Sequence, residues 1–249
     1  MGKEIREMSF LDHLEELRGR LIKSLISIIL FSVVAYVFSD RLLNFLTSPL
    51  PPGQQIYFMS PTEAFSTRIK ISLVAGLIVS VPVIFYHAWK FVVPGLLAKE
   101  TKFIIPIVFS SSIFFLIGAT FCFLLVLPAS IKFLMGFGTE KLKPMIQIKE
   151  YISFVSLMTL AFGAVFELPV ISYFLGKIGL ISAKTLIKGR KYAIVIILIV
   201  AAAITPTPDA FTQLLLACPL YVLYEVSIVV LKLTAKKKDT SEIPHEVEE

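Results

Sequence analysis

The feature that most constrains this chain is a series of apolar runs, several of them long enough to cross a lipid bilayer as a helix. A helix needs about 20 predominantly apolar residues to span a hydrocarbon core of roughly 30 Å. Hydrophobic residues make up 56% of the 249 residues, far more than a soluble domain of this size needs for its core. The sequence therefore predicts an all-α integral membrane protein.

Six apolar segments are candidates for membrane spans, and the last two are joined by the short, proline-bearing link TPTPDA. We expect these two to form a helical hairpin of short spans, because the first arm has only thirteen residues. An arm of that length implies a mismatch with the thickness of the bilayer. The predicted spans are 21–38, 69–89, 103–127, 151–175, 192–204 and 211–231, which make one membrane domain over 1–235 and leave 236–249 as a charged tail that we predict to be disordered.

The distribution of lysine and arginine predicts the orientation, because these residues are retained on the cytoplasmic side of short loops. Six spans put both termini on one side. That side, with its two connecting loops, holds seventeen lysines and arginines, against seven on the other side. The sequence therefore predicts that both termini are cytoplasmic. The net charge of +6 follows from this bias, and no soluble basic domain is present that would favour nucleic acid as a partner.

Several kinds of catalytic chemistry lack their required residues. The phosphate-binding GxxxxGK[ST] loop of an ATP-driven pump is absent, as are the GxSxG and HExxH motifs of serine and zinc hydrolases. Glu15, Glu16 and Arg20 form an EExxxR pattern similar to that of CAAX-type membrane proteases, but His87 is the only candidate for the further histidines of that family. Both cysteines fall inside spans, so we expect no disulfide, metal, cofactor or catalytic site.

One carboxylate, Glu167, lies inside the fourth apolar run, two residues before Pro169. Inserting a carboxylate at that depth costs on the order of 2.5 kcal/mol, which favours a functional role. Our hypothesis is that Glu167 is protonated at rest and donates a hydrogen bond to a partner helix. A structural hydrogen bond to a neighbouring span and a proton-coupled secondary transporter built on this residue remain open alternatives. An intramembrane protease is less favoured.

Prolines recur within the spans and predict the shape of the bundle. Pro169 frees the carbonyl of Val165, so we predict a bend in the fourth span. Pro82, Pro106 and Pro219 can each curve another span. Together they predict a bowed, concave bundle. A water-filled central channel is disfavoured, since the spans offer no ring of polar residues.

Two acidic residues stand in the predicted cytoplasmic segments at positions suited to binding a cation. Ser9 is a candidate cap for a surface helix whose apolar stripe faces the membrane, and Glu16 points away from that stripe. Glu100 lies in the loop between the second and third spans. A carboxylate accepts the planar donor fork of a guanidinium in a bidentate pair that lysine cannot copy. Ordinary ion pairs with neighbouring cations also explain both residues.

Six segments, in order along the chain, resemble segments of the TatC family, the polytopic receptors of the twin-arginine translocase. They are HLEELRGR at 13–20, SPTEAFSTRIKIS at 60–72, FVVPGLLAKE at 91–100, FELP at 166–169, TPTPDAFTQ at 205–213 and LYE at 223–225. Each match alone is weak. Six matches in the correct order across six spans are a specific resemblance.

The resemblance implies a receptor in a bacterial or archaeal plasma membrane that recognises folded cargo by two adjacent arginines in its signal peptide. It also implies export driven by the proton-motive force, single-span TatA and TatB partners, contact with membrane lipid and a multimeric receptor complex. The segment from Asp40 to Phe65 is implied to form a structured outer cap. The implied signal-peptide site consists of Glu16, Glu100, Arg18 and Phe91, and the implied contacts with partner helices are Glu167, Gln213, Thr205 and Asp209.

Overall fold

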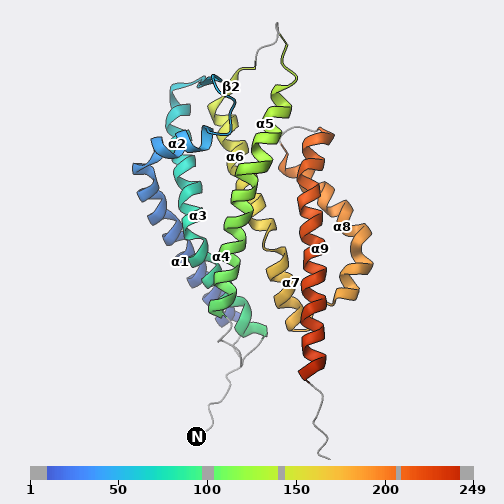
Figure 1. Cartoon of the computed structure of the whole chain (residues 1–249). Helices are drawn as coiled ribbons and strands as arrows, with labels where there is room; N and C mark the ends of the chain where they lie inside the picture. The colour runs from blue at the N-terminus through green and yellow to red at the C-terminus, as the bar shows by residue number, and fades with distance from the viewer. Residues whose placement is uncertain (1–9, 97–103, 140–143, 206–208, 242–249) are drawn as a thin grey trace, which may run out of the picture.

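The computed structural model describes residues 10–96, 104–139, 144–205 and 209–241, and nearly all of them are helical (Figure 1). In chain order the elements are α1 (Phe10–Val37), α2 (Ser39–Thr47), β1 (Ile56–Tyr57), α3 (Pro61–Leu96), α4 (Ile104–Phe121), the π-helical turn η2 (Cys122–Val126), α5 (Leu127–Met135), β2 (Ile146–Gln147), α6 (Ile148–Val165), α7 (Leu168–Lys177), α8 (Ala183–Ile204) and α9 (Ala210–Ser241). The predicted all-α fold class is confirmed.

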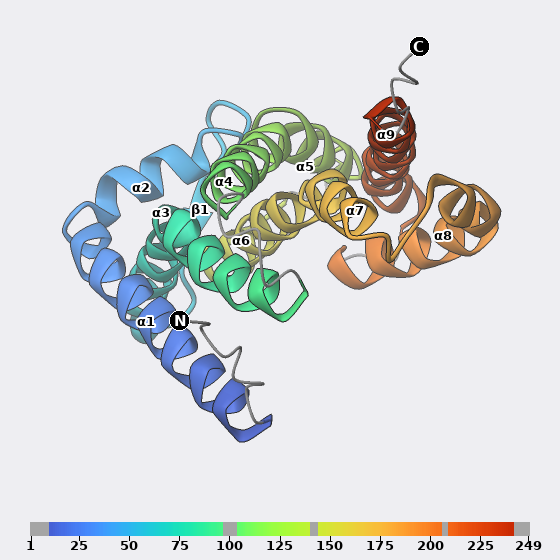
Figure 2. The same ribbon diagram turned by 90° about the horizontal axis from the view of Figure 1, so that it is seen from below.

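The long helices run side by side along one axis, and α1 begins at the same end of the bundle at which α9 finishes (Figure 1). We call this the lower end. The opposite end, which carries α2 and the paired strands β1 and β2, is the upper end. Seen from below, the helices follow an open curve, with α1 and α2 at one edge and α8 and α9 at the other (Figure 2). This arrangement agrees with the predicted concave bundle.

Five segments are long and apolar enough to cross a membrane, which identifies a multi-pass membrane protein. They are Leu11–Val37, Pro61–Val92, Ile104–Met135, Ile148–Lys177 and Ala210–Thr234. α8 is not among them, because its apolar part, the predicted span 192–204, follows a cationic turn with Lys188, Arg190 and Lys191. The helix itself has 22 residues, so this arm is short in its apolar stretch but not as a helix.

Two predicted boundaries are wrong. α1 is one helix of 28 residues, so the predicted surface helix is continuous with the first span. Gly19 is the only helix breaker near the predicted junction, and one glycine costs a helix only about 1 kcal/mol. Ser9, the predicted cap, lies outside the described residues. α9 extends to Ser241, so the sixth helix is not short, and residues 236–241 of the predicted tail continue it, beginning with three lysines, which favour helix.

α1 packs along α3, and a glycine permits their close approach. A Cβ atom at Gly76 of α3 would overlap with Ser32 of α1, so a larger residue would push the two helices apart. The Ser32 hydroxyl donates to the Ile28 carbonyl of its own helix at 2.7 Å and therefore needs no partner across the interface. This packing fixes where the lower end of α1 lies relative to α3.

The predicted bend in the fourth span is confirmed. α6 and α7 meet at Glu167, whose backbone N–H donates to the carbonyl of Ala164, three residues back instead of four. Pro169 follows in the first turn of α7, where a backbone N–H would have no acceptor within the helix, so the missing N–H of proline costs no hydrogen bond. A second irregularity, the π-helical turn η2, precedes Pro128 and was not predicted.

A carboxylate holds the upper end together. Glu63, in the first turn of α3, accepts hydrogen bonds from the backbone N–H groups of Met59 and Lys149 at 2.8 and 3.1 Å. These bonds join the segment before α3 to the start of α6, beside the parallel pairing of β1 with β2. The Tyr151 hydroxyl adds a bond to the Leu46 carbonyl of α2 at 2.8 Å. The segments at this end are therefore clamped to one another.

Replacing Glu63 by alanine should loosen this clamp. We expect amide hydrogen exchange at Met59 and Lys149 to accelerate roughly tenfold, because both N–H groups lose their acceptor. Glu63→Gln keeps one acceptor oxygen and should have a smaller effect. Glu150→Gln removes the same charge from an exposed position nearby and serves as the control. Unchanged exchange at both amides in Glu63→Ala would contradict the clamp.

Candidate functional site

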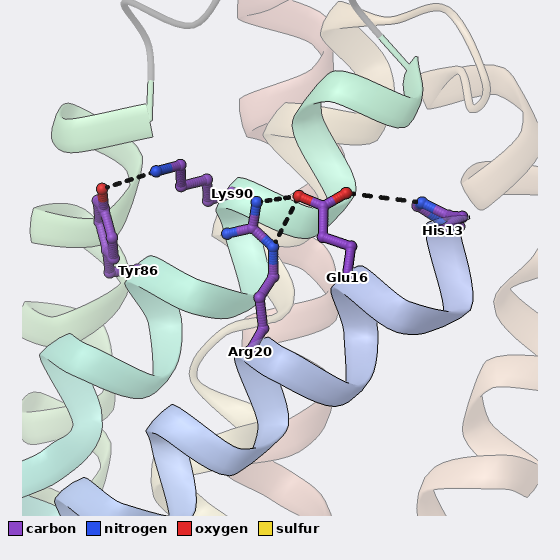
Figure 3. Close-up of polar contacts among 5 residues, drawn as sticks. All are labelled: His13, Glu16, Arg20, Tyr86 and Lys90. Carbon is purple, nitrogen blue, oxygen red and sulfur yellow. Dashed lines mark hydrogen bonds and ion pairs between the residues drawn. The ribbon is translucent and has the colours of Figure 1, made fainter. Parts of the chain in front are cut away.

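The lower end of α1 carries a carboxylate predicted to bind a cation. Glu16 forms an ion pair with Arg20, one helical turn further on (Figure 3). Both Nε and Nη2 of Arg20 donate to the same carboxylate oxygen, Oε1, and the Nε distance is 3.0 Å. The other oxygen, Oε2, faces His13, whose Nδ1 is 4.0 Å away and thus beyond a normal hydrogen bond. One oxygen of Glu16 is engaged, and the other keeps acceptor capacity.

His13 connects this helix to the end of α3. Its imidazole ring stacks on Phe91, with the ring centroids 4.2 Å apart and an angle of 14° between the planes. On the same stretch of α3, Lys90 donates to the Tyr86 hydroxyl at 3.3 Å (Figure 3). The structure thus brings two predicted signal-binding residues, Glu16 and Phe91, together through His13. The sequence alone predicted no separate role for His13.

The structure does not bring Arg18, another predicted signal-binding residue, into this cluster. Arg18 is exposed on α1, and within the described part of the chain it makes no hydrogen bond or ion pair. Glu100 lies outside the described residues. Glu15 is exposed like Arg18 and equally without such a contact among the described residues, so it differs from Glu16, whose carboxylate an arginine holds.

The second predicted site surrounds Glu167, which is 4% exposed at the turn between α6 and α7. Its carboxyl group lies near the Ser111 hydroxyl on α4. Ser111 in turn accepts a hydrogen bond from Nε1 of Trp89 on α3 at 3.0 Å. Among the residues that the structure describes, Glu167 Oε1 has no hydrogen-bond partner. The bond of Trp89 to Ser111 therefore links α3 to α4 beside Glu167, and Oε1 of Glu167 is available to a further partner.

Sequence reasoning missed Trp89 and Ser111. Trp89 is the one tryptophan of the chain, and a buried indole N–H usually has an acceptor. That requirement could have indicated a polar group on a neighbouring span. It could not have selected among the three serines at 110–112, because the choice depends on which face of α4 meets α3. Ser112 instead donates to the Val108 carbonyl of its own helix at 2.8 Å.

Three residues predicted to contact partner helices lie at the upper turn between α8 and α9. Thr205 is buried, and its hydroxyl donates to a carbonyl of its own helix at 2.9 Å. Asp209 caps α9 by accepting a bond from the Thr212 N–H at 2.7 Å. Gln213 donates from Nε2 to the Leu198 carbonyl of α8 at 3.0 Å. Gln213 therefore joins the two arms of the hairpin, while the bonds of Thr205 and Asp209 stabilise the ends of α8 and α9.

The lower half of the same hairpin holds a polar cluster. Nη2 of Arg190 on α8 donates to Oε2 of Glu225 on α9 at 2.7 Å, and the Tyr221 hydroxyl donates to Oε1 of the same carboxylate at 3.0 Å. The Tyr224 hydroxyl donates to the Leu186 carbonyl at 2.7 Å. These bonds hold the cationic turn of α8 against α9.

No group of three or more His, Cys, Asp or Glu side chains that could hold a metal ion occurs in the described part of the chain. Cys122 is buried and Cys218 is exposed, both as free thiols. The chemistry that the two sites support is therefore binding: a partly exposed carboxylate for a cation at the lower end, and a buried carboxyl group for a hydrogen-bonding partner within the bundle.

Comparison with known proteins finds similar chains. A family model described as "Sec-independent protein translocase protein (TatC)" matches residues 12–219. The Sec-independent protein translocase protein TatC of Desulforapulum autotrophicum is 44% identical over 246 residues, which cover 97% of this chain and 91% of that protein. Its counterpart in Carboxydothermus hydrogenoformans is 42% identical over 240 residues, covering 96% and 99%. A crystal structure of the twin-arginine translocase receptor TatC matches with a TM-score of 0.81 at 40% identity, covering 90% of this chain and 99% of that one.

Ser111→Ala removes the acceptor of the Trp89 N–H and should lower the free energy of unfolding by about 1–3 kcal/mol, the cost of a buried unpaired donor. Ser112→Ala is the matched control and should cost less, because that hydroxyl bonds only to its own helix. Thermal unfolding in detergent measures the difference, and fluorescence of Trp89 reports on the surroundings of its ring. Wild-type unfolding and emission in Ser111→Ala would contradict a stabilising bond between Trp89 and Ser111.

Proposed function

This chain belongs to the TatC family of Sec-independent protein translocase proteins, and we propose that it recognises twin-arginine signal peptides through Glu16 at the lower end of the bundle. Membership makes the chain a multi-pass membrane component of a protein translocase and not an enzyme. The solved relative at 40% identity is described as a twin-arginine translocase receptor, which supports the receptor role proposed for this chain.

The observation that carries the proposal is the meeting of two distant motif segments at the stack of His13 on Phe91, with the Glu16 carboxylate beside it. A guanidinium of the signal peptide binds at Oε2, which has no hydrogen bond among the residues that the structure describes, since a carboxylate matches the planar donors of arginine. Phe91 offers an apolar contact for the hydrophobic part of the signal. Arg18 and Glu100 are the further residues proposed to bind the signal, with Glu100 accepting the second arginine.

We place the lower end in the cytoplasm of a bacterial or archaeal plasma membrane, where a signal peptide is met before export. The bias of lysine and arginine toward the termini supports this orientation. Single-span TatA and TatB proteins are the proposed partners. They contact Glu167 and the upper turn with Thr205, Asp209 and Gln213. Several receptor chains assemble in the lipid, and the proton-motive force drives export.

The two alternatives raised by the sequence have weaker support. Membership of a translocase family favours protein transport over a proton-coupled carrier built on Glu167. The protease alternative depended on Glu16 and Arg20, and in the structure these two side chains bind each other. Uptake of a small molecule without any dependence on arginine signals would favour the carrier.

Expression of this chain in cells that lack their own receptor tests the proposed function. A folded reporter with an RR signal should be exported, and the same reporter with KK should not. Glu16→Gln and Glu100→Gln should each reduce RR export by about tenfold or more, because a charge-assisted pair is worth roughly 1.5–3 kcal/mol. Glu15→Gln, an exposed neighbour of equal charge, should export normally. Full RR export by the Glu16→Gln, Glu100→Gln double variant would contradict the assignment.

Variants of Glu167 test its proposed contact with a partner helix. Glu167→Gln keeps a hydrogen-bond donor and should preserve export, whereas Glu167→Ala should reduce it by roughly tenfold because the donor is lost. The two variants are compared at equal amounts of chain in the membrane, measured by immunoblot. Wild-type export by Glu167→Ala would remove this role.

A further inference from the structure

The contact between Arg20 and Glu16 has a geometry that stability alone does not explain. An ion pair between surface residues one helical turn apart adds little to the stability of a helix. Arg20 is nevertheless largely buried, with a side chain 14% exposed against 26% for Glu16. Its two donors converge on Oε1. A guanidinium often binds both oxygens of a carboxylate through parallel bonds, whereas here Oε2 has no hydrogen bond within the described residues and faces His13 at 4.0 Å.

We propose that Arg20 is a positioning residue for signal recognition, which holds the Glu16 carboxylate in one orientation so that Oε2 is presented to a guanidinium of the cargo signal. The inference rests on the proposed role of Glu16 in binding that signal. His13 defines the opposite side of the binding position, since its Nδ1 lies 4.0 Å from Oε2 and its ring is fixed by stacking on Phe91. Without Arg20, Glu16 would sample several rotamers, and only some would direct an oxygen toward His13.

Arg20 has two opposing effects on the affinity for cargo. Ordering the Glu16 side chain before binding removes an entropy cost that corresponds to roughly a tenfold change in affinity. Arg20 also repels the incoming guanidinium, and two unit charges about 6 Å apart change the affinity about threefold at the dielectric constant of water and more at a partly buried site. The affinity of the Arg20 variants for the RR peptide decides which effect is larger.

Two neighbouring residues on α1 show that charge alone does not define the site. Glu15 carries the same charge as Glu16, and Lys23 carries the same charge as Arg20, yet both are exposed. The pair of Glu16 with Arg20 is the one that adjoins the stack of His13 on the end of α3. Glu15 and Lys23 are therefore matched controls for effects of net charge.

The test uses the purified full-length chain in lipid nanodiscs, with a fluorescent synthetic twin-arginine signal peptide as one probe and its KK counterpart as the other. We expect Arg20→Gln to weaken binding of the RR peptide about tenfold and binding of the KK peptide much less, so that the ratio of the two affinities falls. Arg20→Lys keeps the charge but loses the paired donors, and should resemble Arg20→Gln more than the wild type. Lys23→Gln, the control for lost charge, should change either affinity less than about twofold.

Thermal unfolding of each variant is measured in the same nanodiscs, because a purely structural role would lower the unfolding temperature without changing the ratio of RR to KK affinity. Unchanged RR affinity in the two Arg20 variants overturns the inference, and tighter RR binding overturns it by showing that Arg20 competes with cargo. In a Glu16→Gln background, Arg20→Gln should have no further effect, since the two residues act as a unit.

Glu16→Gln separates the two ways of failing. If Glu16→Gln binds the RR peptide as the wild type does, the proposed function of Glu16 fails. If Glu16→Gln loses RR binding while both Arg20 variants keep it, the positioning role alone fails.

Discussion

The packing of α1 on α3 is the constraint on which the recognition site depends. α3 is the helix that α1 contacts most extensively, and the missing side chain of Gly76 lets Ser32 lie directly against it. Because α1 packs along α3 in this way, the ring of His13 stacks on Phe91, and Glu16 lies beside the end of α3. The remaining face of α1 is exposed and apolar, as a lipid-facing helix requires. The site is therefore a property of two packed helices and not of the HLEELRGR segment alone.

Within the bundle, polar groups need partners inside the protein, because lipid offers none. Many of the buried hydroxyls solve this locally: Ser32 and Ser80, for example, each donate to a carbonyl one turn back in the same helix. Oε1 of Glu167 has no partner among the described residues, as is also true of a few buried hydroxyls, but Glu167 is a carboxyl group, which is costlier to bury than a hydroxyl. An incompletely satisfied carboxyl group at the break between α6 and α7 is consistent with a place for a partner helix in the assembled translocase.

The sequence predicted the features that follow from length and composition, and missed those that depend on how helices meet. Bilayer thickness imposes a minimum apolar length, so the long spans were recognised from their runs. The bend at Glu167 was recognised because proline cannot donate a helical hydrogen bond. Glu16 and Phe91 were assigned through resemblance to a family, whereas the link between them through His13, and the bond of Trp89 to Ser111, depend on which helix faces touch. The predicted first and sixth spans were shorter than α1 and α9, because a change from apolar to charged residues marks the edge of the membrane, whereas a helix can continue beyond that edge.

Crosslinking locates the bound signal most directly. A twin-arginine signal peptide with a photoreactive group beside its arginine pair is irradiated with the full-length chain in lipid nanodiscs, and mass spectrometry identifies the crosslinked residues. Recognition at Glu16 predicts crosslinks to the lower end of α1 and to α3 near Phe91, which excess unlabelled RR peptide removes and KK peptide does not. Crosslinks confined to the upper end or to α8 and α9, or equal competition by the KK peptide, would contradict recognition at this site.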